Sequence, residues 1–104
     1  MSKVITEAQF RQTLAEVLLD VSAEAVTGPG RSGAIAAVFA SYLLRIPFVP
    51  YGQPFPGTLL VIDTVSQSGK TMRKASRQCI KLAPRIIPVS VFNQAERLHF
   101  WYEF

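Results

Sequence analysis

The chain has 104 residues, a formal net charge of +4 and 49% hydrophobic residues. A chain of this length forms one domain, residues 1–104, that can bury roughly 60–70% of the surface it exposes when unfolded. Its longest apolar run, residues 34–44, is interrupted by Ser41 and is shorter than the roughly 18 residues that cross a bilayer, so we predict no membrane span. The single cysteine, Cys79, excludes an internal disulfide and, with a start that lacks signal-peptide features, predicts a cytoplasmic protein.

Helix and strand patterns alternate along the first half of the chain. Residues 6–22 predict an amphipathic helix, because Thr6 and Gln9 form a candidate capping box and apolar residues recur at helical spacing. The next segments are predicted as a short strand, a glycine-rich loop and an apolar helix, at residues 23–27, 28–33 and 34–45.

The second half continues this alternation. Strands are predicted at residues 46–50, 58–63, 86–92 and 98–104, and a helix at residues 68–82 with Ser68 as its cap. Pro47 and Pro50 mark the first of these strands as short or near an edge. Strands that alternate with helices predict an α/β fold of three layers, a mostly parallel five-stranded sheet with helices on both faces.

A chemically distinctive stretch runs from residue 57 to residue 72. Its apolar strand ends at Asp63, at the edge where open α/β sheets bind ligands. Small polar residues then precede a helix, whose N-terminal amides and dipole attract anions. The candidate phosphate-binding residues are Ser66, Gln67, Ser68, Gly69, Lys70 and Thr71.

Two families bind phosphates with such a loop. The pattern G-x-x-x-x-G-K-[ST] of nucleotide-hydrolysing P-loops nearly matches residues 64–71, but Thr64 stands in the place of the first glycine. Residues 61–72 resemble more closely the phosphoribosyl pyrophosphate loop of type I phosphoribosyltransferases, in which an apolar strand leads into two acids, a few variable residues and a Thr-Gly pair. The Gly-Lys-Thr-Met ending at residues 69–72 is similar to the hypoxanthine-guanine branch of that family.

A second loop, at residues 26–33, also joins a predicted strand to a predicted helix. The spacing Gly28-x-Gly30-x-x-Gly33 satisfies the dinucleotide-binding pattern, but no acid follows about 20 residues later to bind a ribose. This loop, the apolar helix after it and Ile46-Pro47-Phe48 resemble the pyrophosphate loop, helix and second strand of the type I family. The resemblance covers residues 23–92, about two thirds of the chain.

The resemblance implies a role for each loop. Residues 66–71 would hold a ribose 5-phosphate, and Asp63, the candidate catalytic residue, would bind the ribose hydroxyls. Gly30, Arg31, Ser32 and Gly33 would meet the pyrophosphate, directly or through a magnesium ion that arrives with the ligand. Arg31 suits this role because a guanidinium binds phosphate oxygens bidentately. We identify no metal site in the sequence, and the single histidine, His99, lies among aromatic residues.

The chain departs from the family pattern at four points. Thr64 replaces the second acid of the pair, and Gln67 stands where the purine-using branch has an aspartate beside the base. Residues 51–56 are far shorter than the mobile catalytic loop of the family, and little chain remains for the hood that recognises the base. We therefore expect a minimal, divergent protein that binds phosphoribosyl pyrophosphate or a ribose 5-phosphate, with transferase activity weak, lost or completed by another chain.

Two alternatives stay open. In the first, an active transferase forms its base site across a homodimer, with the aromatic tail at residues 98–104 as cover. In the second, the protein is a regulatory nucleic-acid-binding module that uses the basic segment 70–85, which carries Lys70, Arg73, Lys74, Arg77, Lys81 and Arg85. This second alternative is not favoured, because no aromatic residue is interleaved with these cations.

Overall fold

The computed structural model describes residues 3–66, 69–93 and 98–103. In chain order, the elements are β1 (Lys3–Ile5), α1 (Glu7–Val17), β2 (Ala25–Thr27), α2 (Gly30–Leu44), β3 (Thr58–Ser66), α3 (Lys70–Cys79), β4 (Arg85–Asn93), β5 (Leu98–Phe100) and a 3₁₀ turn, η1 (Trp101–Glu103). None of the helices in these ranges is both long enough and apolar enough to span a bilayer.

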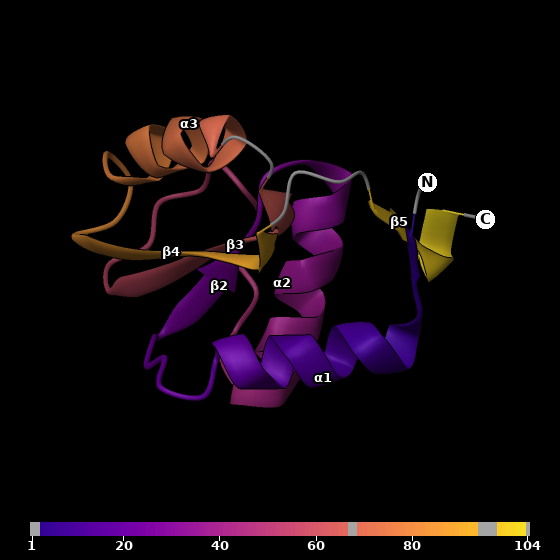
Figure 1. Ribbon diagram of the computed structural model, residues 1–104. Coiled ribbons are helices and arrows are strands. Elements are labelled where there is room, and N and C mark those ends of the chain that lie inside the picture. The colour runs from indigo at the N-terminus through magenta and orange to yellow at the C-terminus, as the bar shows by residue number, and fades with distance from the viewer. Residues whose placement is uncertain (1–2, 67–68, 94–97, 104) are drawn as a thin grey trace.

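The main sheet has three parallel strands in the order β2-β3-β4. Its central strand β3 is buried on both faces: Leu60 and Ile62 pack in the cluster that holds α1 and α2, while Leu59 and Val61 pack in the cluster that holds α3. Helices therefore cover the two faces of the sheet, as Figure 1 shows. This burial explains why β3 has a continuous apolar run rather than an alternating one.

The predicted single five-stranded sheet is wrong, because the strands form two smaller parallel sheets. Residues 46–50 contribute only an isolated bridge between Phe48 and Val26, since Pro47 and Pro50 have no N–H to donate to a ladder. The predicted last strand is β5, which pairs with β1 instead of joining the main sheet. The strand β1 itself was not predicted.

An aromatic cluster joins the small β1-β5 sheet to the helical layer. Phe10 of α1 is fully buried, with its ring centroid 5.4 Å from those of Phe39 and Trp101. Phe92 and Phe100 complete the ring contacts of Phe10. The strands β1 and β5 therefore pack against the main core, and they lie beside each other in Figure 1.

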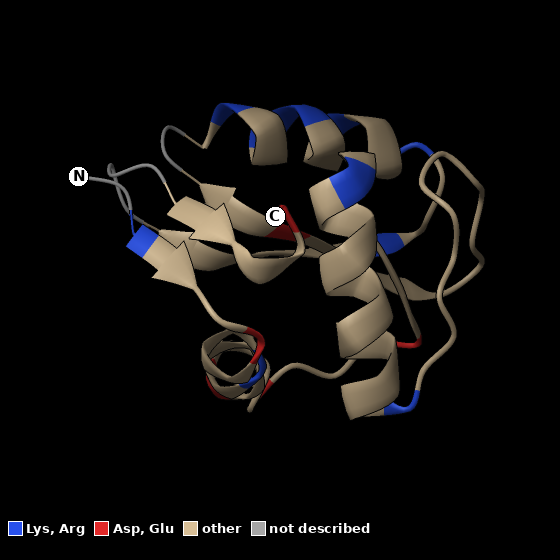
Figure 2. Cartoon of the chain, turned by 90° about the vertical axis from the view of Figure 1, so that its right-hand side faces the viewer, with Lys and Arg blue, Asp and Glu red and all other residues tan. Residues whose placement is uncertain are grey.

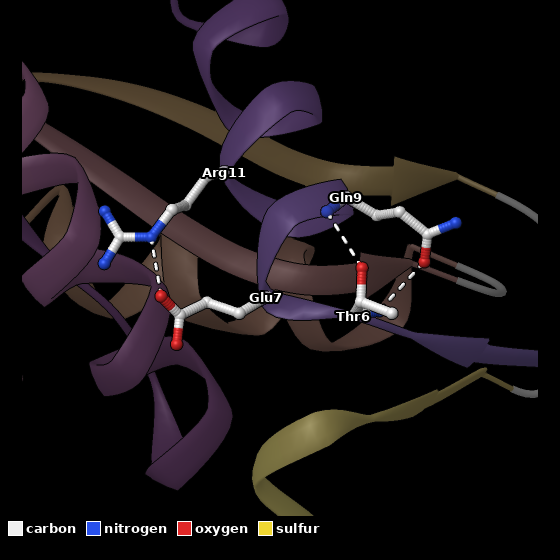
Figure 3. A network of polar contacts seen from close by, with 4 residues as sticks. All are labelled: Thr6, Glu7, Gln9 and Arg11. Carbon is white, nitrogen blue, oxygen red and sulfur yellow. Dashed lines mark hydrogen bonds and ion pairs between the residues drawn. The ribbon is translucent and has the colours of Figure 1, made fainter.

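The capping box predicted for the first helix is confirmed (Figure 3). The Gln9 N–H donates to Thr6 Oγ1 over 3.1 Å, and the Thr6 N–H donates to Gln9 Oε1 over 2.9 Å. The helix ends at Val17 rather than at residue 22. The second helix begins four residues before the predicted position 34, and the third ends at Cys79 rather than at residue 82.

The connection at residues 51–56 packs beside α3. The Tyr51 hydroxyl donates to the Gln78 side chain, and the Phe55 N–H donates over 2.9 Å to the carbonyl oxygen of Leu82, which follows α3. Tyr51 and Phe55 also pack against the apolar cluster under this helix. The connection therefore lies near the C-terminal end of α3, at the opposite end from its N-terminus.

Candidate ligand-binding site

Two helices begin at the carboxyl edge of the main sheet. Because β2 and β3 run parallel and in register, the chain leaves both strands at the same edge and then enters α2 and α3. The N-cap residues Pro29 and Gly69 supply no side-chain cap to these helices, so their first amides are not satisfied by their own caps. Such N-termini suit anions.

The β2-α2 loop depends on one close approach of the backbone. A Cβ atom on Gly28 would lie 2.0 Å from the carbonyl oxygen of Gly33 and 2.7 Å from that of Ile62. Only glycine fits at this position. The first turn of α2 is thereby held against β3.

A cavity of about 320 Å³ lies between these two helix starts. This volume is at the lower end of the roughly 300–1,000 Å³ typical of small-molecule sites. The residues that line the cavity are Ser32, Asp63, Thr64, Val65, Ser66, Gly69, Thr71, Met72 and Ser90. Hydroxyl groups and one carboxylate thus dominate its polar wall.

The structure brings Ser32, Asp63, Ser66, Gly69 and Thr71 of the predicted site into this cavity. Ser66 is the last residue of β3, whereas Gly69 is the N-cap of α3 with φ of 74°. Gln67 and Ser68, including the predicted cap, lie outside the described residues.

The other predicted site residues that the structure describes do not line this cavity. Lys70 is exposed in the first turn of α3. Gly30 is exposed with φ of 66°, and the Gly33 N–H donates to the Pro29 carbonyl. Arg31 is exposed and borders a separate apolar hollow along α2, beside Ile35.

Asp63 is the carboxylate of the cavity, and only 9% of its surface is exposed. Its Oδ1 accepts the backbone N–H of Thr64 over 2.8 Å. Burial raises the pKa of Asp63, and the hydrogen bonds with Thr64 only partly oppose this effect. A group that donates hydrogen bonds to Asp63 would therefore stabilise its charged form.

Tyr102 of the 3₁₀ turn connects the start of α2 to β3. Its hydroxyl donates to Ser32 Oγ over 3.1 Å and also forms a hydrogen bond with Thr64. Burial raises the pKa of Tyr102, so the phenol stays neutral. Thr64, which replaces the second acid of the loop pattern, is 2% exposed.

The sequence analysis did not single out Ser90 or Tyr102. Ser90 lies opposite Asp63 in the β3-β4 register, and a serine within the apolar run of residues 86–92 was a usable signal. Tyr102 carried no such signal, because the aromatic residues at the end of the chain are typical of a core. Among the described residues, no group of three or more His, Cys, Asp or Glu side chains could hold a metal ion.

Comparison with solved structures tests the fold. No protein-family model matches the chain, and no curated protein matches it by sequence. The structure is similar to that of a purine phosphoribosyltransferase from Pyrococcus horikoshii, with a TM-score of 0.79 and 23% identity over 99% of this chain and 95% of that one. The chain shares a phosphoribosyltransferase-like fold. At this identity the likeness establishes the fold alone.

A second solved structure with a similar fold contains a bound nucleotide. It is a hypothetical protein from Neisseria gonorrhoeae with bound ppGpp, which matches with a TM-score of 0.76 and 14% identity. The match covers 100% of this chain and 91% of that one. The first comparison supports the phosphoribosyltransferase-like fold that the sequence resemblance implied.

Proposed function

We propose that the protein binds phosphoribosyl pyrophosphate or a related ribose 5-phosphate compound at the carboxyl edge of the main sheet. The observation that carries this proposal is the cavity that joins two helix N-termini to one buried carboxylate. The two helix N-termini suit two phosphate groups, and the carboxylate between them can accept hydrogen bonds from sugar hydroxyls. This arrangement matches a sugar that carries phosphate groups at two positions.

Each part of the cavity has a chemical role in this proposal. Ser66, Gly69 and Thr71 line the end of the cavity at α3, where hydroxyls and helix amides suit a 5-phosphate. Asp63 accepts hydrogen bonds from the ribose hydroxyls. Ser32 lies in the first turn of α2 and donates to the pyrophosphate.

Magnesium fits this donor set only together with the ligand. Mg²⁺ is commonly bound by one or two carboxylates plus substrate phosphates, and Asp63 is the carboxylate that lines this cavity. With the ligand bound, the ion would neutralise phosphate charge, while Asp63 would hold the ribose hydroxyls.

We propose that transfer to a base is weak or lost in the isolated chain. Thr64 supplies a hydroxyl where the family pattern has a second carboxylate, which would stabilise positive charge on the ribose. Hydrogen bonds to Gln78 of α3 and to Leu82 just after it hold the connection at residues 51–56 near the C-terminal end of this helix, away from the cavity. A second chain that supplies base contacts in a homodimer remains the route to full activity.

Calorimetric titration with phosphoribosyl pyrophosphate and Mg²⁺ tests the binding proposal. We expect saturable binding, weakened at least about tenfold by Asp63→Asn, because hydrogen bonds to a charged group contribute roughly 1.5–3 kcal/mol. Asp20→Asn is the matched control, since Asp20 is exposed and outside the cavity. Ribose 5-phosphate, ATP and ppGpp are titrated in parallel. Absence of binding, or equal affinities of the wild type and Asp63→Asn, would contradict the proposal.

A second candidate function, nucleic-acid binding, is favoured by the charge of α3. No acidic residue occurs between Asp63 and Glu96, whereas the basic residues there include Arg73 and Arg77. Figure 2 shows only basic charge along this helix. Arg73 and Arg77 also line a groove of about 500 Å³ between α3 and β4.

Salt dependence separates this candidate from the first. A short RNA or DNA duplex that binds along α3 would lose affinity steeply with salt, because neutralised phosphates release counterions. Arg77→Gln would then weaken binding and reduce the salt slope by about one, while Arg45→Gln, at the far end of α2, would not. A duplex affinity that is unchanged in Arg77→Gln would exclude this surface.

A further inference from the structure

We propose that Tyr102 is a positioning residue that aims the Ser32 hydroxyl at the pyrophosphate group, so that the site discriminates pyrophosphate-bearing ligands from ribose 5-phosphate. This inference rests on the proposed function and deepens it. It concerns a tyrosine outside both loops that links their cavity-lining residues.

The hydrogen bond between Tyr102 and Ser32 is the first step of this inference. The Tyr102 hydroxyl donates its single proton to Ser32 Oγ over 3.1 Å. Because Ser32 accepts this bond, its own proton is not used there. Ser32 lines the cavity, so that proton is available to an anion at the start of α2.

Thr64 is a second hydrogen-bond partner of the Tyr102 hydroxyl. Its side chain also forms a hydrogen bond with Asp63 that favours the charged form of this carboxylate. A carboxylate at position 64 could only accept, and would draw the Tyr102 proton away from Ser32. With Thr64 in place of an acid, the Ser32 hydroxyl therefore keeps its own proton to donate to the ligand.

Aromatic packing holds Tyr102 in place for this role. Its ring stacks on Phe100 with centroids 5.5 Å apart and an interplanar angle of 12°. Trp101 meets the edge of the Tyr102 ring at 5.0 Å and packs in turn against Phe39 at 5.8 Å. A hydroxyl on so constrained a ring orders Ser32 without a further loss of side-chain freedom.

Paired titrations of wild type and Tyr102→Phe test the inference. Phenylalanine keeps the ring contacts and removes only the hydroxyl. We expect Tyr102→Phe to weaken phosphoribosyl pyrophosphate binding roughly three- to tenfold, as for one neutral hydrogen bond. Ribose 5-phosphate affinity should be unchanged. The control is Tyr42→Phe, because Tyr42 is 82% exposed on α2.

A double-mutant cycle with Ser32→Ala separates positioning from direct contact. If Tyr102 acts through Ser32, Tyr102→Phe has no further effect once Ser32 is alanine. Additive losses, equal losses for both ligands, or no loss in Tyr102→Phe would each overturn the inference. Titration of the wild type with phosphoribosyl pyrophosphate tests the proposed function independently of these variants. If binding is absent, the proposed function fails and the inference falls with it.

Discussion

Asp63 shows how a single residue can reduce stability while it serves a site. Its carboxyl is almost completely buried, and it accepts hydrogen bonds from the backbone N–H and the side chain of Thr64. Burial raises the pKa of Asp63 above its ordinary value. Between the two pKa values the folded protein binds more protons than the unfolded chain, so stability falls as the pH rises through the folded-state pKa.

Asp63→Asn should therefore stabilise the ligand-free protein at pH 7. Asparagine keeps an acceptor for the Thr64 N–H and has no charge to desolvate, so we expect a gain on the order of 1 kcal/mol. For a domain of this size, this gain is roughly 4–8 °C in the midpoint of thermal unfolding. The difference should disappear below about pH 4, where unfolded aspartate is protonated. An equal or lower midpoint at pH 7 would contradict this description of Asp63.

Single residues also show what the sequence could predict of the site. Asp63, Ser66 and Gly69 belong to one strand-loop-helix segment, so local patterns were sufficient to predict that they lie together. Tyr102 is far from that segment, and its contact with Ser32 depends on how the β1-β5 sheet packs against α1 and α2. No local pattern contains that information.

At the scale of elements, the start of α2 depends on the glycines of the β2-α2 loop. Gly28→Ala places a methyl group against two backbone carbonyls, which cannot move as a flexible side chain would. We expect a loss of at least about 3 kcal/mol in the free energy of unfolding, the upper end of typical overpacking costs.

Gly30→Ala is the matched control for this loop. Its Cβ would have no atom within 4 Å, so the cost is limited to the left-handed backbone at φ +66°, about 1–2 kcal/mol. Thermal unfolding should therefore show a clearly larger shift for Gly28→Ala than for Gly30→Ala. Equal shifts would mean that the close approach at Gly28 does not hold the loop.

The elements also explain where the predicted sheet failed. Apolar patterns were sufficient to predict the long elements α1, β3 and β4. Helical spacing indicated α1, and a continuous apolar run that is buried on both faces indicated β3. The segment around Phe48 was predicted as a strand from its composition, but the two flanking prolines reduce it to one bridge. The three-residue strands β1 and β5 pair with each other across the length of the chain. The strand β5 was predicted, as part of residues 98–104, whereas β1 was not.

At the scale of the whole molecule, two candidate anion-binding surfaces adjoin each other. The cavity lies at the carboxyl edge of the sheet, between the starts of α2 and α3 and near Tyr102. The basic face of α3 lies outside it, with Arg73 and Arg77 in the neighbouring groove (Figure 2). Because both linings include Ser66 and Gly69, a ligand in the cavity is distinguished by shifts at Ser32, and a polyanion in the groove by shifts at Arg73 and Arg77.

Amide chemical shifts in an NMR titration with phosphoribosyl pyrophosphate and Mg²⁺ test the central claim most directly. The account predicts that resonances from both helix starts, those of Ser32, Gly69 and Thr71, shift together and saturate at one affinity. Lys74 and Gln78, on the exposed face of α3, should not shift. Shifts confined to α3, or shifts at one loop only, would contradict a single site built from the two loops.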